Sequence, residues 1–346
     1  MSDFPPDPTA ALPFAHAGPP FRGQLKASVD DFQVDECLGY TPSGSGEHLF
    51  LRIRKRGLNT LDVARLLAQH AAVKPVAIGF AGLKDKHATT TQTFSVQLPG
   101  KEEPDWSPME NDQLKILDAQ RHQRKIRRGT LRGNAFVLHL RGLQGDHAKA
   151  EQVLHNIATQ GVPNYFGQQR FGHGASNLYQ ADRWFSGQLK RPKPEQKRMY
   201  LSASRSYLFN QVLAARVDAG TWQQALLGDV MLLEGSKRQF LADQAEQIDT
   251  VIKQRVQSLD IHPSGPLVGQ PGHACHPVLE AASFENQVLQ QADKADWCDA
   301  LPRIGIDAGR RALRLPVVDL QYEWLDQEVL RLQFTLAAGG YATAVV

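Results

Sequence analysis

The feature of this sequence that most restricts its fold is a polar loop between two strand-like runs. Residues 76–78 are apolar, and in residues 93–98 the side chains of Phe94, Val96 and Leu98 alternate with polar ones. An alternation with period two is typical of a β-strand that buries one face. The residues between the runs, 79–92, are mostly glycine or polar. The pattern therefore predicts two strands joined by a polar loop.

A single carboxylate stands in this loop. Asp85 lies between Lys84 and Lys86, and His87 follows. Catalytic groups concentrate on loops that a rigid scaffold holds in place. Positive charge on both sides favours the ionised form of an acid, which suits a nucleophile or general base better than a general acid. The residues alone leave open a solvated turn of mixed charge.

Composition limits the class of protein. The chain of 346 residues suffices for two domains, and its hydrophobic fraction of 42% can fill their cores. The net charge is only +3, so contact with nucleic acid has to come from local clusters of cations. The three cysteines are few and far apart, which argues against a disulfide scaffold and fits a reducing compartment. The first twenty residues contain six prolines and no apolar segment, so we expect a mobile tail at 1–20 and no signal peptide.

Two segments carry clustered cations. Residues 121–132 contain six cations and no acid. These predicted phosphate contacts are Arg121, Arg124, Lys125, Arg127, Arg128 and Arg132. The run leads into Asn134 and Phe136, an amide and an aromatic ring of the kind that binds the edge and face of a pyrimidine. A strand at residues 48–56 carries four more cations, Arg52, Arg54, Lys55 and Arg56, which fit phosphate contacts and a solvated strand end equally well.

The loop around Asp85 resembles a known family signature. Residues 82–92 read GLKDKHATTTQ, which is similar to the signature of the TruD family of tRNA pseudouridine synthases. Similarity to the family continues in DFQVDE at 31–36, GNAF at 133–136, VPNYFGQQRFG at 162–172 and FTLAAGGYAT at 334–343. These segments span nearly the whole chain, which makes a chance match improbable.

The resemblance implies a fold and a domain organisation. We expect an α/β (α+β) fold whose catalytic domain has a mixed, largely antiparallel sheet flanked by helices. A second α/β domain, the TRUD insertion domain, would interrupt it at residues 162–307. The catalytic domain would then comprise residues 21–161 and 308–346.

The resemblance also implies an activity and its residues. Family members isomerise uridine to pseudouridine in tRNA, at position 13 of the D-arm, without a cofactor or metal. Asp85 would be the catalytic carboxylate, and attack at C1′ and removal of a C2′ proton both remain open as its role. The expected substrate-binding residues are Lys26, Phe32, Asn134, Phe136 and Phe334. Of these, Asn134 would hold the uracil, the phenylalanines would pack around it, and Lys26 would pair with the carboxylate. We expect a cytoplasmic monomer that binds tRNA and has neither a membrane nor a protein partner.

Two other readings differ in chemistry. A non-catalytic RNA-binding or RNA-folding protein could keep the same fold, although the intact Asp85 argues against it. A metal-dependent nuclease could use Asp85 and His87, but no second carboxylate stands at matching loop spacing. A metal cluster at residues 273–276, which read HACH, lacks the second pair of ligands that a closed zinc site needs.

Overall fold

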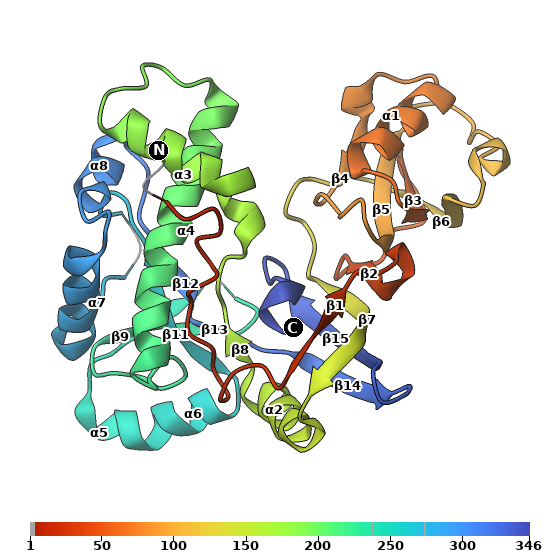
Figure 1. The fold of residues 1–346 in the computed structure, drawn as a ribbon. Helices are drawn as coiled ribbons and strands as arrows, with labels where there is room; N and C mark the ends of the chain where they lie inside the picture. Colours follow the sequence, from red (N-terminus) through yellow and green to blue (C-terminus); the bar gives the residue numbers. More distant parts are fainter. Residues whose placement is uncertain (1–3, 237, 273–274) are drawn as a thin grey trace. The chain divides into compact units, whose positions relative to one another are not determined.

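The computed structural model describes residues 4–236, 238–272 and 275–346, and the chain divides into two compact units (Figure 1). We call the first the sheet unit; it comprises Pro20–Glu151 and Val317–Gly340. The second, the helical unit, comprises residues 4–19, Gln152–Pro316 and Tyr341–Val346. Each unit is therefore assembled from segments that are distant in the sequence.

The sheet unit is built on a mixed sheet of nine strands in the described part of the chain. Seven of them follow the order β14 (Val318–Trp324), β15 (Leu330–Ala337), β7 (Gly133–Gly145), β2 (Phe32–Cys37), β5 (Thr89–Gln97), β3 (His48–Arg56) and β6 (Leu114–His122). In addition, β1 (Phe21–Leu25) pairs with β7, and β4 (Ile78–Phe80) pairs with β5. Only β2 and β5 run parallel; the other pairs are antiparallel. This confirms the predicted mixed and largely antiparallel sheet.

One helix covers part of this sheet. α1 (Thr60–His70) packs the buried side chains of Val63 and Leu67 against β3 and β5. Their partners come from one face of these strands, namely Leu49, Leu51, Ile53, Phe94 and Val96. Because residues two apart on a strand share a face, the alternation seen in the sequence generates this core.

α2 and the helical unit contain the remaining elements. The sequence pattern predicts a helix from Asp146 to Gln160, with Asp146 as its cap and Gly161 as its end. α2 (His147–Gln160), which begins in the sheet unit, confirms this, because Asp146 Oδ1 lies 3.0 Å from the Lys149 amide and Gly161 has a φ of +75°. The helices of the helical unit are α3 (Ser176–Phe185), α4 (Pro194–Asp218), α5 (Ala245–Gln247), α6 (Lys253–Gln257), α7 (Leu279–Gln291) and α8 (Trp297–Arg303). Its strands form a sheet ordered β10 (Gln239–Ala242), β9 (Asp229–Leu233), β11 (Ile261–Leu267) and β12 (Gly309–Ala312), and a separate pair of β8 (Val162–Pro163) with β13 (Arg314–Leu315). None of the helices in the described ranges is both long and apolar enough to span a bilayer.

The unit bounds differ from the domain bounds expected from the sequence. The expected insertion, 162–307, lies inside the helical unit, but that unit also takes in residues 308–316. The reason is strand pairing, because Arg314 and Leu315 of β13 lie opposite Pro163 and Val162 of β8. Sequence periodicity does not reveal such long-range pairing.

The tail expected to be mobile is packed in the structure. Phe4 is buried, and its ring centroid lies 5.8 Å from that of Tyr207 and 5.7 Å from that of Trp297. The Tyr165 hydroxyl donates a hydrogen bond to the carbonyl of Pro13 at 3.2 Å. Proline restricts the unfolded chain and so lowers the entropy lost when a segment becomes ordered. A proline-rich composition is therefore compatible with this packing.

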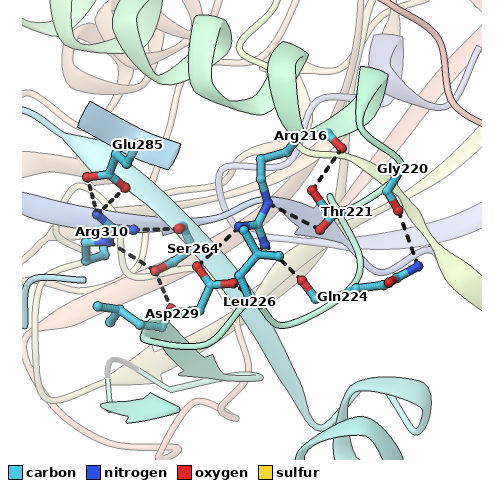
Figure 2. Close-up of polar contacts among 10 residues, drawn as sticks. Arg216, Gly220, Thr221, Gln224, Leu226, Asp229, Ser264, Glu285 and Arg310 are labelled. Carbon is cyan, nitrogen blue, oxygen red and sulfur yellow. Dashed lines mark hydrogen bonds and ion pairs between the residues drawn. The ribbon is translucent and has the colours of Figure 1, made fainter. Parts of the chain in front are cut away.

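Two buried ion pairs lie inside the helical unit (Figure 2). Arg310 of β12 donates to both carboxylate oxygens of Glu285 on α7, at 2.9 and 2.8 Å. Arg216 of α4 contacts Asp229 of β9 at 2.8 Å. Ser264 of β11 accepts a hydrogen bond from Arg310 Nε at 3.1 Å. Burial raises the pKa of Glu285. These groups join two helices to three strands through contacts that depend on charge.

Candidate active site

The loop that carries Asp85 spans residues 81–88, between β4 and β5. Its backbone is fixed by two buried side chains. Gln92 Nε2 donates to the carbonyl of Gly82 at 2.6 Å, and Thr60 Oγ1 accepts from the Lys84 amide at 2.9 Å. Thr60 Oγ1 also donates to Gln92 Oε1 at 3.0 Å. The loop is therefore held by the first residue of α1 and by β5. β5 itself begins at Thr89, so the end of the predicted loop is strand.

The strand register brings side chains from five strands onto one face. Residues directly opposite in a ladder share a face of the sheet. One such row consists of Phe334, Phe136, Val34, Thr90 and Lys55, on β15, β7, β2, β5 and β3. Asn134, two residues from Phe136 on β7, lies opposite Glu36 of β2. The register alone thus assembles residues that are distant in the sequence.

Three phenylalanines form what we call the aromatic wall, consisting of Phe32, Phe136 and Phe334. The centroids of Phe136 and Phe334 lie 5.4 Å apart in a stacked arrangement, and those of Phe32 and Phe136 lie 6.1 Å apart at 75°. All three rings are buried. The structure therefore brings together the three aromatics that the resemblance assigned to the uridine pocket.

Lys26 connects Asp85 to the aromatic wall, because it contacts both the Asp85 carboxylate and the ring of Phe32. Lys26 Nζ contacts Asp85 Oδ2 at 2.6 Å and also lies 4.1 Å from the ring centroid of Phe32. The side chains of Asp85 and Lys26 are 36% and 24% exposed, so the pair is accessible from solvent. Lys26 has a φ of +63°, a conformation that costs a non-glycine residue about 1–2 kcal/mol. Lys26 therefore holds an unfavourable backbone conformation at the position where its ammonium group contacts both the Asp85 carboxylate and the ring of Phe32.

Lys84 orients the amide of Asn134. Lys84 Nζ lies 2.7 Å from Asn134 Oδ1 and 3.0 Å from Glu36 Oε2. An ammonium group can only donate hydrogen bonds, so the oxygen of the Asn134 amide faces Lys84 and its NH₂ group faces elsewhere. Glu36 is buried and also accepts the amide hydrogen of Thr93 at 3.2 Å. Asn134 is therefore prepared to donate a hydrogen bond, as recognition of a uracil carbonyl requires.

Lys55 belongs to the interior of the site, and our grouping of it with possible phosphate contacts was wrong. Its side chain is fully buried, and Nζ donates to the carbonyls of Leu58 at 2.6 Å and Asp85 at 3.1 Å. Burial lowers the pKa of Lys55 to about 8, although the Asp85 carboxylate opposes the shift. The sequence indicates this orientation, because Lys55 lies two residues after Ile53 and four after Leu51 and so shares the buried face of β3 with them. A lysine at such a position points inward.

The six predicted phosphate contacts separate into two groups. Arg121 and Lys125 are half-buried and donate to backbone carbonyls, those of Lys101 and Val76 respectively. The four exposed members are Arg124, Arg127, Arg128 and Arg132. The amide of Gly129, in the same run, donates to the carbonyl of Ala81 at 2.8 Å. Exposed cations therefore lie on a loop that is hydrogen-bonded to the start of the Asp85 loop.

The described residues do not assemble a metal-binding site. No group of three or more His, Cys, Asp or Glu side chains there is placed to hold a metal ion. His273, a member of the possible cluster at residues 273–276, lies outside the described residues.

Comparison with known proteins identifies sequence relatives along nearly the whole chain. The family model for tRNA pseudouridine synthase D (TruD) matches residues 11–182 and 175–346. A tRNA pseudouridine synthase D from Methylococcus capsulatus is 46% identical over 97% of this chain and 93% of its own. One from Aeromonas salmonicida is 47% identical over 97% and 92%.

The fold also matches a solved structure. A crystal structure assigned to tRNA pseudouridine synthase D from Methanosarcina mazei superposes with a TM-score of 0.75. It covers 99% of this chain and 97% of its own at 21% identity, which establishes similarity of fold. The resemblance seen in the loop sequence is confirmed by these findings. The chain belongs to the tRNA pseudouridine synthase D family.

Proposed function

We propose that this protein converts the uridine at position 13 of the D-arm of tRNA to pseudouridine, with Asp85 as its catalytic carboxylate. The observation that carries the proposal is the Asp85–Lys26 pair beside the aromatic wall. Family membership supports the reaction class. The sheet unit would be the catalytic domain, because every proposed substrate-binding residue belongs to it.

The reaction requires few groups. The N1–C1′ bond breaks, the uracil turns, and a C5–C1′ bond forms; C5 loses a proton and N1 gains one. Asp85 would either attack C1′ or remove a C2′ proton, and both routes need its negative charge. Lys26 would hold one carboxylate oxygen so that the other faces the ribose. The target base has to leave its stack before any of these steps.

The remaining residues would hold the uracil while it is detached. The NH₂ group of Asn134 would donate to a uracil carbonyl, since Lys84 occupies its oxygen. Phe136 would stack on the ring, and the wall would keep water from the intermediate. The exposed cations of residues 121–132 would bind RNA phosphates. We infer that the protein acts as a monomer in the cytoplasm, with tRNA as its partner.

Replacing Asp85 tests the catalytic assignment. Asp85→Asn keeps the size of the side chain and removes its charge, so we expect turnover to fall by on the order of 10⁴ or more. Affinity for tRNA should change little or increase, because the carboxylate acts chiefly in the transition state. Phe136→Ala should weaken binding and rate together, since stacking of a base is worth about 1–3 kcal/mol. Single-turnover release of tritium from 5-labelled uridine, with filter binding, separates the two patterns.

A change in the substrate tests the position. A tRNA transcript with cytidine in place of uridine at position 13 should bind normally and release no tritium. Release from that transcript would disprove position 13 as the target. Substantial pseudouridine formation by Asp85→Asn would remove Asp85 from the catalytic role, and absence of product with the unaltered protein would favour a non-catalytic RNA-binding function.

A further inference from the structure

A further cluster of cations lies in the helical unit, in the loop between α3 and α4 (Figure 1) and in the first two turns of α4. Residues 190–198 hold five cations and a single acid, Glu195. We call the five the α3–α4 basic turn: Lys190, Arg191, Lys193, Lys197 and Arg198. All five are exposed. Among the ion pairs of the described residues, none involves a member of this turn.

The backbone of the turn is ordered by local contacts. The Leu189 amide donates to the carbonyl of Arg183 at 2.8 Å, and the Lys193 amide donates to Gln196 Oε1 at 3.0 Å. Pro194 occupies the first turn of α4, where its fixed φ suits a helix. Arg191 adopts a φ of +57°, which is unfavourable for a non-glycine residue. A solvated charged linker has no need of such constraints, whereas a surface that presents cations at set positions does.

Two aromatic rings of α3 contact cations, and one of these cations, Lys197, belongs to the turn. Lys197 Nζ lies 5.6 Å from the ring centroid of Trp184, and the guanidinium of Arg183 lies 5.8 Å from that of Tyr179. Tyr179 is 38% exposed. Proteins that bind single-stranded or looped RNA combine cations for the backbone with aromatic rings or arginine planes for stacking of bases.

We propose that the α3–α4 basic turn is a second RNA-binding surface, which contacts the phosphate backbone of the substrate at a place other than the target uridine. The inference rests on the proposed function, because it takes RNA as the ligand. Five like charges within nine residues repel one another, and an external polyanion relieves that repulsion. The surface would contribute to affinity and to the choice of tRNA and would take no part in the chemical step.

Charge reversal tests the proposal. The variant Lys190→Glu/Arg191→Glu/Lys193→Glu alters exposed side chains only, so its thermal melt should match that of the unaltered protein. Removing one cation that binds a phosphate lowers the slope of log K against log salt by roughly 0.7–0.9. Removing three such cations should therefore reduce the slope by roughly 2–3. The KM for tRNA should rise, and kcat at saturating tRNA should stay unchanged.

A matched control separates a local effect from one of overall charge. The variant Arg238→Glu/Lys253→Glu/Arg303→Glu makes the same change in net charge at exposed positions of the same unit. It should keep the salt slope of the unaltered protein. An unchanged slope in the first variant, or an equal reduction in both, would overturn the proposal. So would a first variant that binds tRNA normally but no longer binds anionic phospholipid vesicles.

The outcomes also separate this inference from the proposed function. If the unaltered protein binds tRNA with a salt slope that only the first variant reduces, yet forms no pseudouridine, the surface is supported and the proposed activity fails. If it forms pseudouridine and both variants behave identically, the activity stands and the surface fails.

Discussion

The buried ammonium of Lys55 should make stability depend on pH in a predictable direction. In the unfolded chain a lysine has its ordinary pKa of 10.5, whereas burial lowers the value to about 8 in the folded protein. Between those values the unfolded state binds more protons than the folded state, so the stability contributed by this group rises with pH. At 1.36 kcal/mol for each pH unit, the full effect is about 3 kcal/mol. Most of it, about 2–3 kcal/mol, should appear between pH 7 and pH 10.

Lys55→Met isolates this effect. Methionine retains most of the length of the side chain and cannot titrate, so the free-energy difference between the two proteins should move in favour of Lys55 by about 2–3 kcal/mol from pH 7 to pH 10. Urea unfolding at several pH values measures it. Lys115→Met, which alters an exposed lysine on the neighbouring strand β6, is the matched control and should show no such trend. A difference that is the same at every pH would refute the reasoning.

The same variant should affect catalysis through position. Lys55 donates a hydrogen bond to the backbone carbonyl of Asp85, so its removal takes away one constraint on the position of the carboxylate while leaving the Asp85 side chain itself unaltered. A displacement of about 1 Å at a reacting group can cost on the order of 10²-fold in rate. We expect kcat to fall by that order and affinity for tRNA to stay constant. In the unaltered protein, activity should decline above about pH 8 as the ammonium loses its proton.

Three further predictions concern other parts of the molecule. Lys26→Met should lower kcat by on the order of 10² in single-turnover assays with little change in tRNA affinity, because Asp85 loses the partner that positions it; an effect confined to KM would contradict this. Charge reversal of Arg124, Arg127 and Arg132, three exposed arginines in residues 121–132, should lower the salt slope of RNA binding by roughly 2–3 for every RNA tested. An unchanged slope would exclude phosphate contacts at these residues. Arg310→Met should reduce the free energy of unfolding in urea by about 3–5 kcal/mol, because it leaves Glu285 buried without its partner, whereas the double variant with Glu285→Leu should recover most of that stability. Equal destabilisation by both variants would show that the ion pair itself is not the cause.

Structural features that depend on neighbouring residues could be predicted from this sequence more fully than features that depend on contacts between distant segments. The strand at residues 48–56 and the cap of α2 followed from periodicity and from the position of Asp146, because both depend on neighbours in the sequence. For residues 199–219 the sequence predicts a helix, but α4 begins five residues earlier, at Pro194, since proline suits the first turn of a helix and the charged side chains that follow it show no apolar periodicity.

Prediction of the candidate active site from neighbouring residues has the same limit. Asp85 stood out as the single acid of a cationic loop, whereas the roles of Glu36 and Lys84 depend on the pairing of β2 with β7, which no local window contains. Lys55 is the exception, because its place on the buried face of β3 follows from its spacing to Leu51 and Ile53 within one strand. The roles given to Asp85 and the aromatic wall remain predictions, since they describe a reaction with a substrate.

The division of the sheet unit between two segments has a consequence for how the protein is made. During synthesis β7 emerges early, but its neighbour β15 follows only after all of residues 152–316 have been translated. Until then one edge of β7, from Gly133 to Leu140, has no strand beside it. An unpaired edge can add strands from other chains, and non-local pairs form slowly because a long loop has to close first. Slowing translation within residues 152–316 should therefore increase aggregation of the nascent chain, and Phe334 can join the aromatic wall only after β15 has been translated.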